Sequence, residues 1–537
     1  MANSSQTDTI KLHIYELIFF IYFGVMFGAR AIGLYEGQTL YNLCLVLGIG
    51  FFALKVLTTK HTVLEYIVIA ALLLLSLLVY KNTGEKGLLL YFTMMLSMKG
   101  IKENSPIRFG LTILSISYVA LFILSMTGII DELNHMVKRS GYGFILRHSL
   151  GYPYPNTTHT TFLILLMLFF YLYKAKSFKE LLSASVTAML INVYLFIYTI
   201  SFTGLISVTA YLVLNLYFSD RKKLTSPEGI LITAFYPLIL AFSILGPLLA
   251  KGAAFEFLNK LLHKRYEYAL YFLQNEKITA FGSRFGETPT SWYMLDNSFL
   301  YLFLQLGVIP FIIVSLLYFF WIISLVKENK GRKIAIMLTF YLIGMSDPFL
   351  YNLSYKNITF LFVGAWLFGV LEKSAEKLPA FLSKELQILS FGEKEVELRI
   401  PYLDRLSAIP SKIAGEIKQD KLRYILIFFI CVVLGSSIYT MAVKKPSVLY
   451  INEKAADPYD SKKKQTYLTP EDVQSIIASG DIIEDYKDEA TPMYAFKKKA
   501  PLAEYARGIM SAGLLLGVFT VLMLSLKKVF AKEKSIS

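Results

Sequence analysis

The sequence predicts an all-α polytopic membrane protein, because long apolar segments follow one another along most of the chain. The 537 residues are 55% hydrophobic and 15% aromatic but only 17% charged, and the mean hydropathy is +0.53. A soluble protein of this length carries more charge. Charged residues also gather in the joins between the apolar segments. Backbone groups in lipid must be hydrogen-bonded within their own segment, so we expect each apolar segment to be a helix.

About fourteen segments approach the roughly 20 apolar residues that a membrane-spanning helix needs. The fourth, eleventh and twelfth of them are short. In chain order the expected spans are 12–33, 38–57, 63–80, 87–101, 108–130, 158–174, 181–200, 203–219, 228–250, 298–325, 333–346, 357–372, 424–443 and 508–526.

Every second join is basic, and this pattern predicts the orientation of the chain. Joins that carry Lys and Arg remain in the cytoplasm. The N-terminus and the C-terminus are then both cytoplasmic, and the joins 131–157, 251–297 and 347–356 lie outside the cytoplasm. The basic residues concerned are Lys55, Lys60, Lys99, Lys102, Arg108, Lys174, Lys176, Lys179, Arg221, Lys222, Lys223, Lys327, Lys330, Arg332 and Lys333, with Lys527, Lys528, Lys532 and Lys534 in the tail.

We expect three parts in the chain: a membrane core at 1–372, a cytoplasmic amphipathic linker at 373–423, and a C-terminal transmembrane hairpin at 424–537. In the linker, the spacing of the apolar residues from Phe381 to Leu389 favours a helix on the inner membrane surface, or else a partly disordered segment. The hairpin contains an extracytoplasmic insert at 444–507. Within the insert, Thr469 to Asp472 is typical of a helix N-terminus, and Gly480 of its end.

The first charged join carries Arg147 and His148 before a turn with two prolines, and then Asn156 at the start of a span. Helix N-termini attract anions, so an arginine there is a candidate phosphate ligand. The alternative is an arginine that extends to the lipid headgroups. The third join, Asp347 to Asn357, is more typical of a polar turn with helix caps.

The second join carries Arg265, Arg284 and Glu287, and ends in Asp296-Asn297 where a span begins. Solvated ion pairs are one explanation, and such pairs contribute little to stability. If all three joins lie on one side of the membrane, arginines, a histidine and carboxylates converge there. Such a face favours chemistry on an anionic, lipid-borne substrate.

Several other functions are excluded by the residue pattern. The net charge of +15 arises from clusters between spans, which is a topology signal and not a nucleic-acid surface. The six histidines have no metal-binding spacing, and no nucleotide fingerprint occurs. Cys44 and Cys431 lie in apolar spans and are expected to be buried thiols. We therefore predict neither a metal nor a cofactor.

These motifs, in this order, resemble the Wzy-type polymerases of bacterial capsule and O-antigen synthesis, in the O-antigen polymerase/ligase group. The segment Arg147 to Asn156 resembles an Arg-x-Ser-Leu-Gly-Phe-x-His-Pro-Asn stretch of that family. The region around Arg265 resembles its arginine-bearing outer helix, and Leu295 to Tyr301 its Asp-Asn segment. Two departures are Tyr154, where the family often has histidine, and Lys264, where glycine is common. The resemblance covers residues 10–372.

The resemblance implies a metal-independent membrane glycosyltransferase of the bacterial cytoplasmic membrane, active in capsular, O-antigen or exopolysaccharide synthesis. Its donor and acceptor would be oligosaccharides on undecaprenyl diphosphate, and a chain-length regulator and a flippase are candidate partners. Arg147, Arg265 and Arg284 would bind the pyrophosphate. The candidate bases are His148, Glu287 and Asp296, and the candidate glycan ligands are Asn156, Asn297 and Tyr152.

Two alternative functions remain open. A ligase of the same group would transfer the glycan to another acceptor. A lipid-linked oligosaccharide flippase or other transporter also has many spans, although transport sites usually lie near the middle of spans. The aromatic residues of the joins, among them Trp292 and Tyr301, are equally typical of an interfacial belt.

Overall fold

The computed structural model describes the chain apart from residues 1–8, 131, 133–134, 140–142, 220, 222, 290–292, 352–355, 400–402, 447, 453–481, 486–492, 498 and 537. It is mostly helical, and ten of the described helices are long and apolar enough to cross a membrane. The predicted class of all-α polytopic membrane protein is confirmed at this level.

The four other expected spans form helices that are shorter or more polar. They are α4 (Gly87–Leu96), α6 (Pro155–Leu172), α15 (Gly331–Gly344) and α16 (Thr359–Ala375). Most of their side chains are buried in the protein. Because other helices shield them from lipid, their length and composition are less constrained than those of lipid-facing spans.

The chain folds as two compact units. Unit 1 contains 1–12, 133–149 and 395–537, and unit 2 contains 13–132 and 150–394. The first charged join is therefore divided, since residues 133–149 belong to unit 1 while the residues on both sides belong to unit 2. Where the chain leaves unit 2 and returns to it, Leu150 N donates a hydrogen bond of 2.7 Å to Glu132 Oε1.

Unit 2 is a helical bundle with its most buried helices inside. Helix α15 packs against α8 and α4 against α16. Gly364 of α16 makes the second contact close, since a Cβ there would lie 2.1 Å from Met95 O. The longer helices are α1 (Ile14–Ala31), α2 (Thr39–Thr58), α3 (Val63–Thr83), α5 (Asn104–Met126), α7 (Phe178–Thr199), α8 (Phe202–Ser219), α9 (Ser226–Ile244) and α14 (Val308–Lys327).

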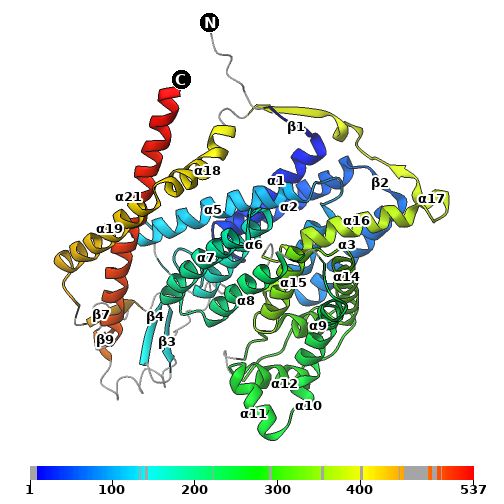
Figure 1. Ribbon diagram of the computed structural model, residues 1–537. Coiled ribbons are helices and arrows are strands. Elements are labelled where there is room, and N and C mark those ends of the chain that lie inside the picture. The colour runs from blue at the N-terminus through cyan, green and yellow to red at the C-terminus, as the bar shows by residue number, and fades with distance from the viewer. Residues whose placement is uncertain are drawn as a thin grey trace. The chain divides into compact units, whose positions relative to one another are not determined.

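Short elements cover the two ends of unit 2 (Figure 1). One end, which we call the α12 end, carries α10 (Gly246–Leu249), α11 (Gly252–Leu261), α12 (Arg265–Asn275) and α13 (Ser298–Leu304). The other end carries β2 (His61–Thr62), α17 (Ala380–Ser383), β5 (Glu385–Leu386) and the 3-10 helix η2 (Ser390–Glu393).

The helix expected from the apolar residues Phe381 to Leu389 forms only as the single turn α17. The chain then becomes extended and β5 pairs antiparallel with β2, so that Leu386 lies opposite His61. This segment pairs as a strand with a distant segment although its local apolar spacing is helical. A single sequence does not reveal such a distant pairing. The amphipathic helix of the linker is instead α18 (Leu403–Gln419), in unit 1.

Unit 1 contains the expected C-terminal hairpin, formed by α19 (Lys421–Ala442) and α21 (Lys499–Ile536). Small residues let the two helices approach closely, as is common between membrane helices. A Cβ at Gly435 would lie 2.5 Å from Ala512 O, and Ser436 Oγ donates to Ile509 O at 3.1 Å. The helix predicted to begin at Thr469 lies outside the described residues.

Unit 1 also contains strands that the sequence did not predict. β3 (His135–Arg139) and β4 (Gly143–Arg147) form an antiparallel hairpin, and β4 contacts α21. β7 (Val448–Asn452), β9 (Met493–Lys497) and β8 (Ile482–Asp485) form a sheet in that order, and β1 (Thr9–His13) pairs with β6 (Glu395–Arg399).

Candidate functional site

The α12 end of unit 2 is organised around Arg265, the first residue of α12. His263 and Lys264 precede it with positive φ angles of 50° and 69°, which produces the tight turn between α11 and α12. The left-handed conformation of Lys264 favours glycine, the residue that the family resemblance would place there. The turn directs the Arg265 side chain towards the end of α15.

The Arg265 guanidinium joins three segments of the chain. Its Nε donates to Ser346 O at 3.2 Å, its Nη1 to Leu262 O at 3.3 Å and its Nη2 to Asp296 Oδ2 at 3.4 Å. The Arg265 side chain is 21% exposed and that of Asp296 37% exposed. The join 251–297 therefore meets, at this arginine, the end of the expected span 333–346, just before the join 347–356 begins.

Asp296 lies just before the N-cap of α13. Asn297 Oδ1 accepts from Phe299 N and Leu300 N, both at 3.0 Å, and its Nδ2 donates to Met345 O at 3.5 Å. Ser298 Oγ donates to Asp347 O at 2.5 Å. Asn297 and Ser298 thus attach α13 to the turn after α15, and this attachment positions Asp296. Asn297, predicted to bind glycan, makes a helix cap with its side-chain oxygen.

Asp296 has an unusual pKa for an aspartate. Burial raises the pKa of Asp296, Arg265 lowers it and the nearby Asp347 carboxylate raises it, and the net result is a pKa of about 6. Protein surrounds the carboxylate on most sides, yet more than a third of the side-chain surface remains open to solvent. A deep but accessible carboxylate with this pKa is suited to proton transfer near neutral pH.

A second buried charge lies next to Asp347. Burial and the nearby Arg30 lower the pKa of Lys356 while Asp347 opposes them, and the net result is a pKa of about 7. Arg30 lies in the last turn of α1, donates from Nη1 to Leu34 O at 2.9 Å and stacks over the Tyr41 ring at 5.4 Å. We call Arg30, Arg265, Asp296, Asp347 and Lys356 the charged cluster.

The sequence reasoning missed Arg30 and Lys356 as members of a site. Arg30 was visible only as a charge at the end of the first expected span. Lys356 is 7% exposed, but nothing in its neighbours along the chain indicates burial. Asp347-Pro348 was interpreted as a polar turn, and the short helix η1 (Pro348–Leu350) does begin there. A charge at the end of an apolar span was the one available signal.

Arg284 lies in the loop that leads from α12 to α13. Val308 N and Ile309 N donate to Thr279 O and Ala280 O, and hold the loop against the start of α14. Gly282 has a φ of +77°, and a Cβ there would lie 2.1 Å from Gln305 O. Arg284 is exposed, with its guanidinium beside Gly84 in the turn between α3 and α4. Burial raises the pKa of the neighbouring Glu85.

The remaining predicted residues of unit 2 differ in accessibility. Glu287 is exposed, and its backbone oxygen accepts from Tyr271 OH at 3.5 Å. Asn156 is exposed as the second residue of α6. Tyr152 is 2% exposed and its hydroxyl donates to Ala31 O at 3.1 Å, which is a core position. Trp292 lies outside the described residues.

Arg147 and His148 belong to unit 1. Arg147 ends β4 opposite His135. His148 Nε2 lies 2.8 Å from Glu504 Oε2 of α21, with side chains 13% and 17% exposed. Arg507 also contacts Glu504 and donates to Leu146 O at 2.9 Å. The sequence reasoning did not connect these C-terminal residues with the first join.

His159 is wholly buried in α6. Its Nδ1 lies 3.1 Å from Thr199 Oγ1 and its Nε2 lies 2.6 Å from Asn192 Oδ1. Both ring nitrogens thus have protein partners, as is usual for a core histidine.

The part of the chain that the structure describes contains no group of three or more His, Cys, Asp or Glu residues that could hold a metal ion. No family model, no curated protein and no solved structure matches this chain.

Proposed function

We propose that the protein is a membrane glycosyltransferase that polymerises oligosaccharide repeat units carried on undecaprenyl diphosphate. The charged cluster carries this proposal. It combines cations that suit a diphosphate with an accessible carboxylate whose pKa of about 6 suits a general base. The resemblance to Wzy-type polymerases independently favours the same chemistry.

The reaction follows from the chemistry of the substrates. The acceptor hydroxyl attacks the anomeric carbon of the donor glycan and forms the new glycosidic bond. The bond from that carbon to the diphosphate oxygen breaks, and undecaprenyl diphosphate leaves with the electron pair. Asp296 accepts the proton of the attacking hydroxyl.

The cations stabilise the charge that develops on the leaving diphosphate. We assign this role to Arg265, with Arg30 and Lys356 beside it. Fixed cations in a partly dehydrated site stabilise a transition state without reorganisation, and one such donor contributes about 10²–10³-fold in rate. Arg284 is exposed on the same end of unit 2, where it is a candidate contact for the glycan or for the diphosphate.

The proposal includes the finer topology and the location of the protein. About fourteen spans, with both termini in the cytoplasm, place the α12 end outside the cytoplasm of a bacterial cell. Arg147 and Asn156 remain candidate substrate ligands in this proposal, and His148 remains a candidate base. A chain-length regulator and a flippase are the proposed protein partners, and membrane lipid surrounds the bundle.

The test is the size distribution of lipid-linked and surface glycans in a strain that lacks the protein. Single repeat units on the lipid carrier, without a ladder, support polymerisation. Arg265→Ala should fail to restore the ladder, while Lys373→Ala, an exposed lysine of α16, should restore it.

The same gel distinguishes the alternative functions. Full-length glycan retained on its lipid carrier would identify a ligase. Lipid-linked repeat units protected from an external glycosidase would identify a flippase, and the enzyme proposal would then be wrong. A wild-type ladder in the strain that lacks the protein would exclude all three functions.

A further inference from the structure

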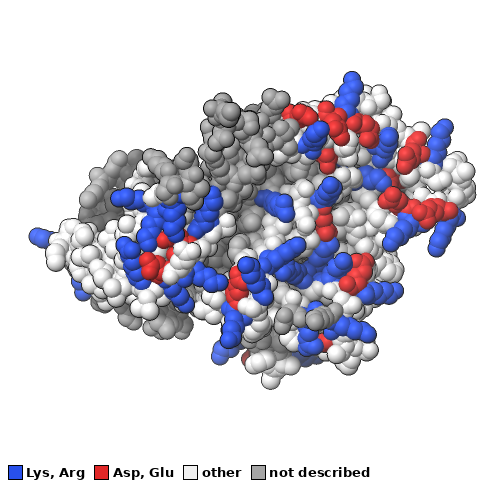
Figure 2. All heavy atoms as spheres, turned by 45° about the horizontal axis from the view of Figure 1, so that its top comes forward, with Lys and Arg blue, Asp and Glu red and all other residues white. Residues whose placement is uncertain are grey.

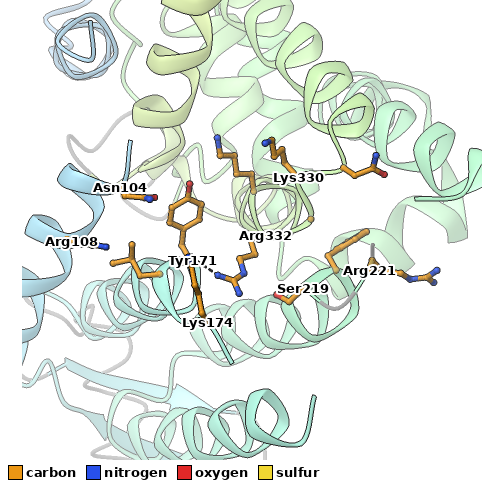
Figure 3. Close-up of a pocket in the computed structure, with 13 residues that line it drawn as sticks. Asn104, Arg108, Tyr171, Lys174, Ser219, Arg221, Lys330 and Arg332 are labelled. Carbon is orange, nitrogen blue, oxygen red and sulfur yellow. Dashed lines mark hydrogen bonds between the residues drawn. The ribbon is translucent and has the colours of Figure 1, made fainter. Parts of the chain in front are cut away.

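A basic pocket lies at the opposite end of α15 from the charged cluster. It has a volume of about 370 Å³ and is found where α5 and α15 begin and where α6 and α8 end (Figure 3). Many Lys and Arg side chains gather on the face turned forward in Figure 2, with Asp and Glu among them. The six cations that line the pocket are Arg108, Lys174, Arg221, Lys330, Arg332 and Lys333.

The charge inside the pocket is incompletely balanced. Among the described residues, no carboxylate pairs with Arg108, Lys174 or Arg332, and the pocket lining includes no acid. The other three cations do have acidic partners nearby: Lys333 with Glu103 at 2.5 Å, Arg221 with Glu228 at 2.8 Å and Lys330 with Glu328 at 3.7 Å. Three positive charges therefore remain available to an anion.

Arg332 lies at the centre of the pocket and is held there. Its Nη1 donates to Tyr171 O at 2.9 Å, which leaves its other N–H groups for a ligand (Figure 3). Arg332 is also the second residue of α15, whose N-cap residue Lys330 forms no side-chain cap. The positive end of the helix dipole therefore adds to the charge of the side chains.

An apolar groove adjoins the basic pocket. It has a volume of about 460 Å³ and is lined by Phe178, Val213, Leu216 and Tyr217. Phe178 is 49% exposed and Val213 60% exposed, on the outer surface of α7 and α8. Arg221 lines both spaces, and its Nη2 donates to Tyr217 OH at 2.6 Å.

We infer that this pair of sites binds one anionic phospholipid, with its phosphate headgroup in the basic pocket and an acyl chain along the groove. A free phosphate would use the cations but not the groove. A neutral lipid would use the groove but not the three unbalanced charges. Basic pockets between helices at the cytoplasmic membrane surface commonly bind such headgroups. This inference does not depend on the proposed glycosyltransferase activity.

The test uses the full chain in detergent, with phosphatidylglycerol, phosphatidylcholine or inorganic pyrophosphate added and bound molecules counted by native mass spectrometry. Arg108→Gln with Lys174→Gln should weaken phosphatidylglycerol binding about 30-fold, since each cation contributes roughly 1 kcal/mol. Both side chains are exposed, so the fold should persist. The matched control, Lys176→Gln with Lys373→Gln, removes two exposed charges outside the pocket and should bind normally.

A third variant separates a lipid from a free phosphate. Val213→Asn should weaken phosphatidylglycerol binding and leave pyrophosphate binding unchanged. Equal phosphatidylglycerol binding by the pocket variant and its control would overturn the inference. Pyrophosphate binding that exceeds lipid binding, with no effect of Val213→Asn on the lipid, would overturn it in favour of a soluble anion. Equal binding of phosphatidylcholine and phosphatidylglycerol would exclude a headgroup-specific site.

Discussion

Asp296→Asn separates the proposed catalytic role of this residue from its structural role. The substitution keeps the shape of the side chain and removes its charge. It also replaces the anion opposite the Arg265 Nη2, which lies 3.4 Å away. Loss of a general base lowers the rate by about 10²–10⁴-fold. We therefore expect the glycan ladder to disappear.

The effect on stability should be small, because two contributions oppose each other. The pKa of Asp296 is about 6 instead of 3.8, which for a fully buried group corresponds to about 3 kcal/mol. The side chain is 37% exposed, so solvent screening reduces this to roughly 1.5 kcal/mol. Asparagine relieves that penalty but loses about 1 kcal/mol from the Arg265 pair.

The assay is polymerisation of purified lipid-linked repeat units in proteoliposomes, with thermal unfolding measured on the same samples. The wild-type rate should rise as the pH passes through about 6, because the carboxylate must ionise to accept a proton. Glu287→Gln, an exposed acid of the same loop, is the control. A full ladder from Asp296→Asn, or loss of activity from Glu287→Gln alone, would refute the assignment of the base.

Three further predictions concern the charged cluster and unit 1. Arg265→Lys keeps the charge but lacks the planar guanidinium that bonds both Ser346 O and Asp296 Oδ2. Activity in the same assay should therefore fall about 10²-fold. An unchanged rate would contradict the positioning role. The pKa of Lys356 in the folded protein is about 7, below the pKa of a lysine in the unfolded chain. Between pH 7 and pH 10 the unfolded state therefore binds more protons than the folded state. The free energy of unfolding should rise over this range, by at most about 1.4 kcal/mol per pH unit. Lys356→Met should remove this slope in thermal unfolding, and a slope that persists would assign it to another group. Glu504→Gln weakens the contacts with His148 and Arg507 and should lower the stability of unit 1 by about 1–3 kcal/mol, whereas Glu372→Gln, an exposed acid of α16, should not.

The membrane class could be predicted because span length and charge position depend on the bilayer and not on tertiary packing. The small strands could not be predicted in this way. β4 contacts α21, more than three hundred residues later in the chain, and β5 pairs with β2. Such pairings depend on contacts between distant segments, whereas the apolar spacing of 381–389 is local and predicted a helix.

The candidate site was partly predictable for the same reason. Arg265 and Asp296 could be singled out because their join combines arginines with carboxylates where a span begins, and alternating topology predicted that this join and the one after α15 share one side of the membrane. Topology does not say which helices are neighbours, so the approach of Arg30 and Asp347 to Lys356 was not foreseen. Nor can residue type alone distinguish a ligand from a helix cap such as Asn297 or a core residue such as Tyr152.

The hydrogen bond between Leu150 N and Glu132 Oε1 has a practical meaning for shortening the protein. It closes the point where the chain leaves unit 2 and returns to it. Truncation after Lys394 alone would remove α21 and keep β4. His148 and Leu146 O would then lose their contacts to Glu504 and Arg507. Removing 133–149 as well, with a short linker from Glu132 to Leu150, deletes the two larger segments of unit 1 and leaves the chain of unit 2 continuous. Residues 133–149 and 395–537, two of the three segments of unit 1, are therefore best exchanged or deleted together.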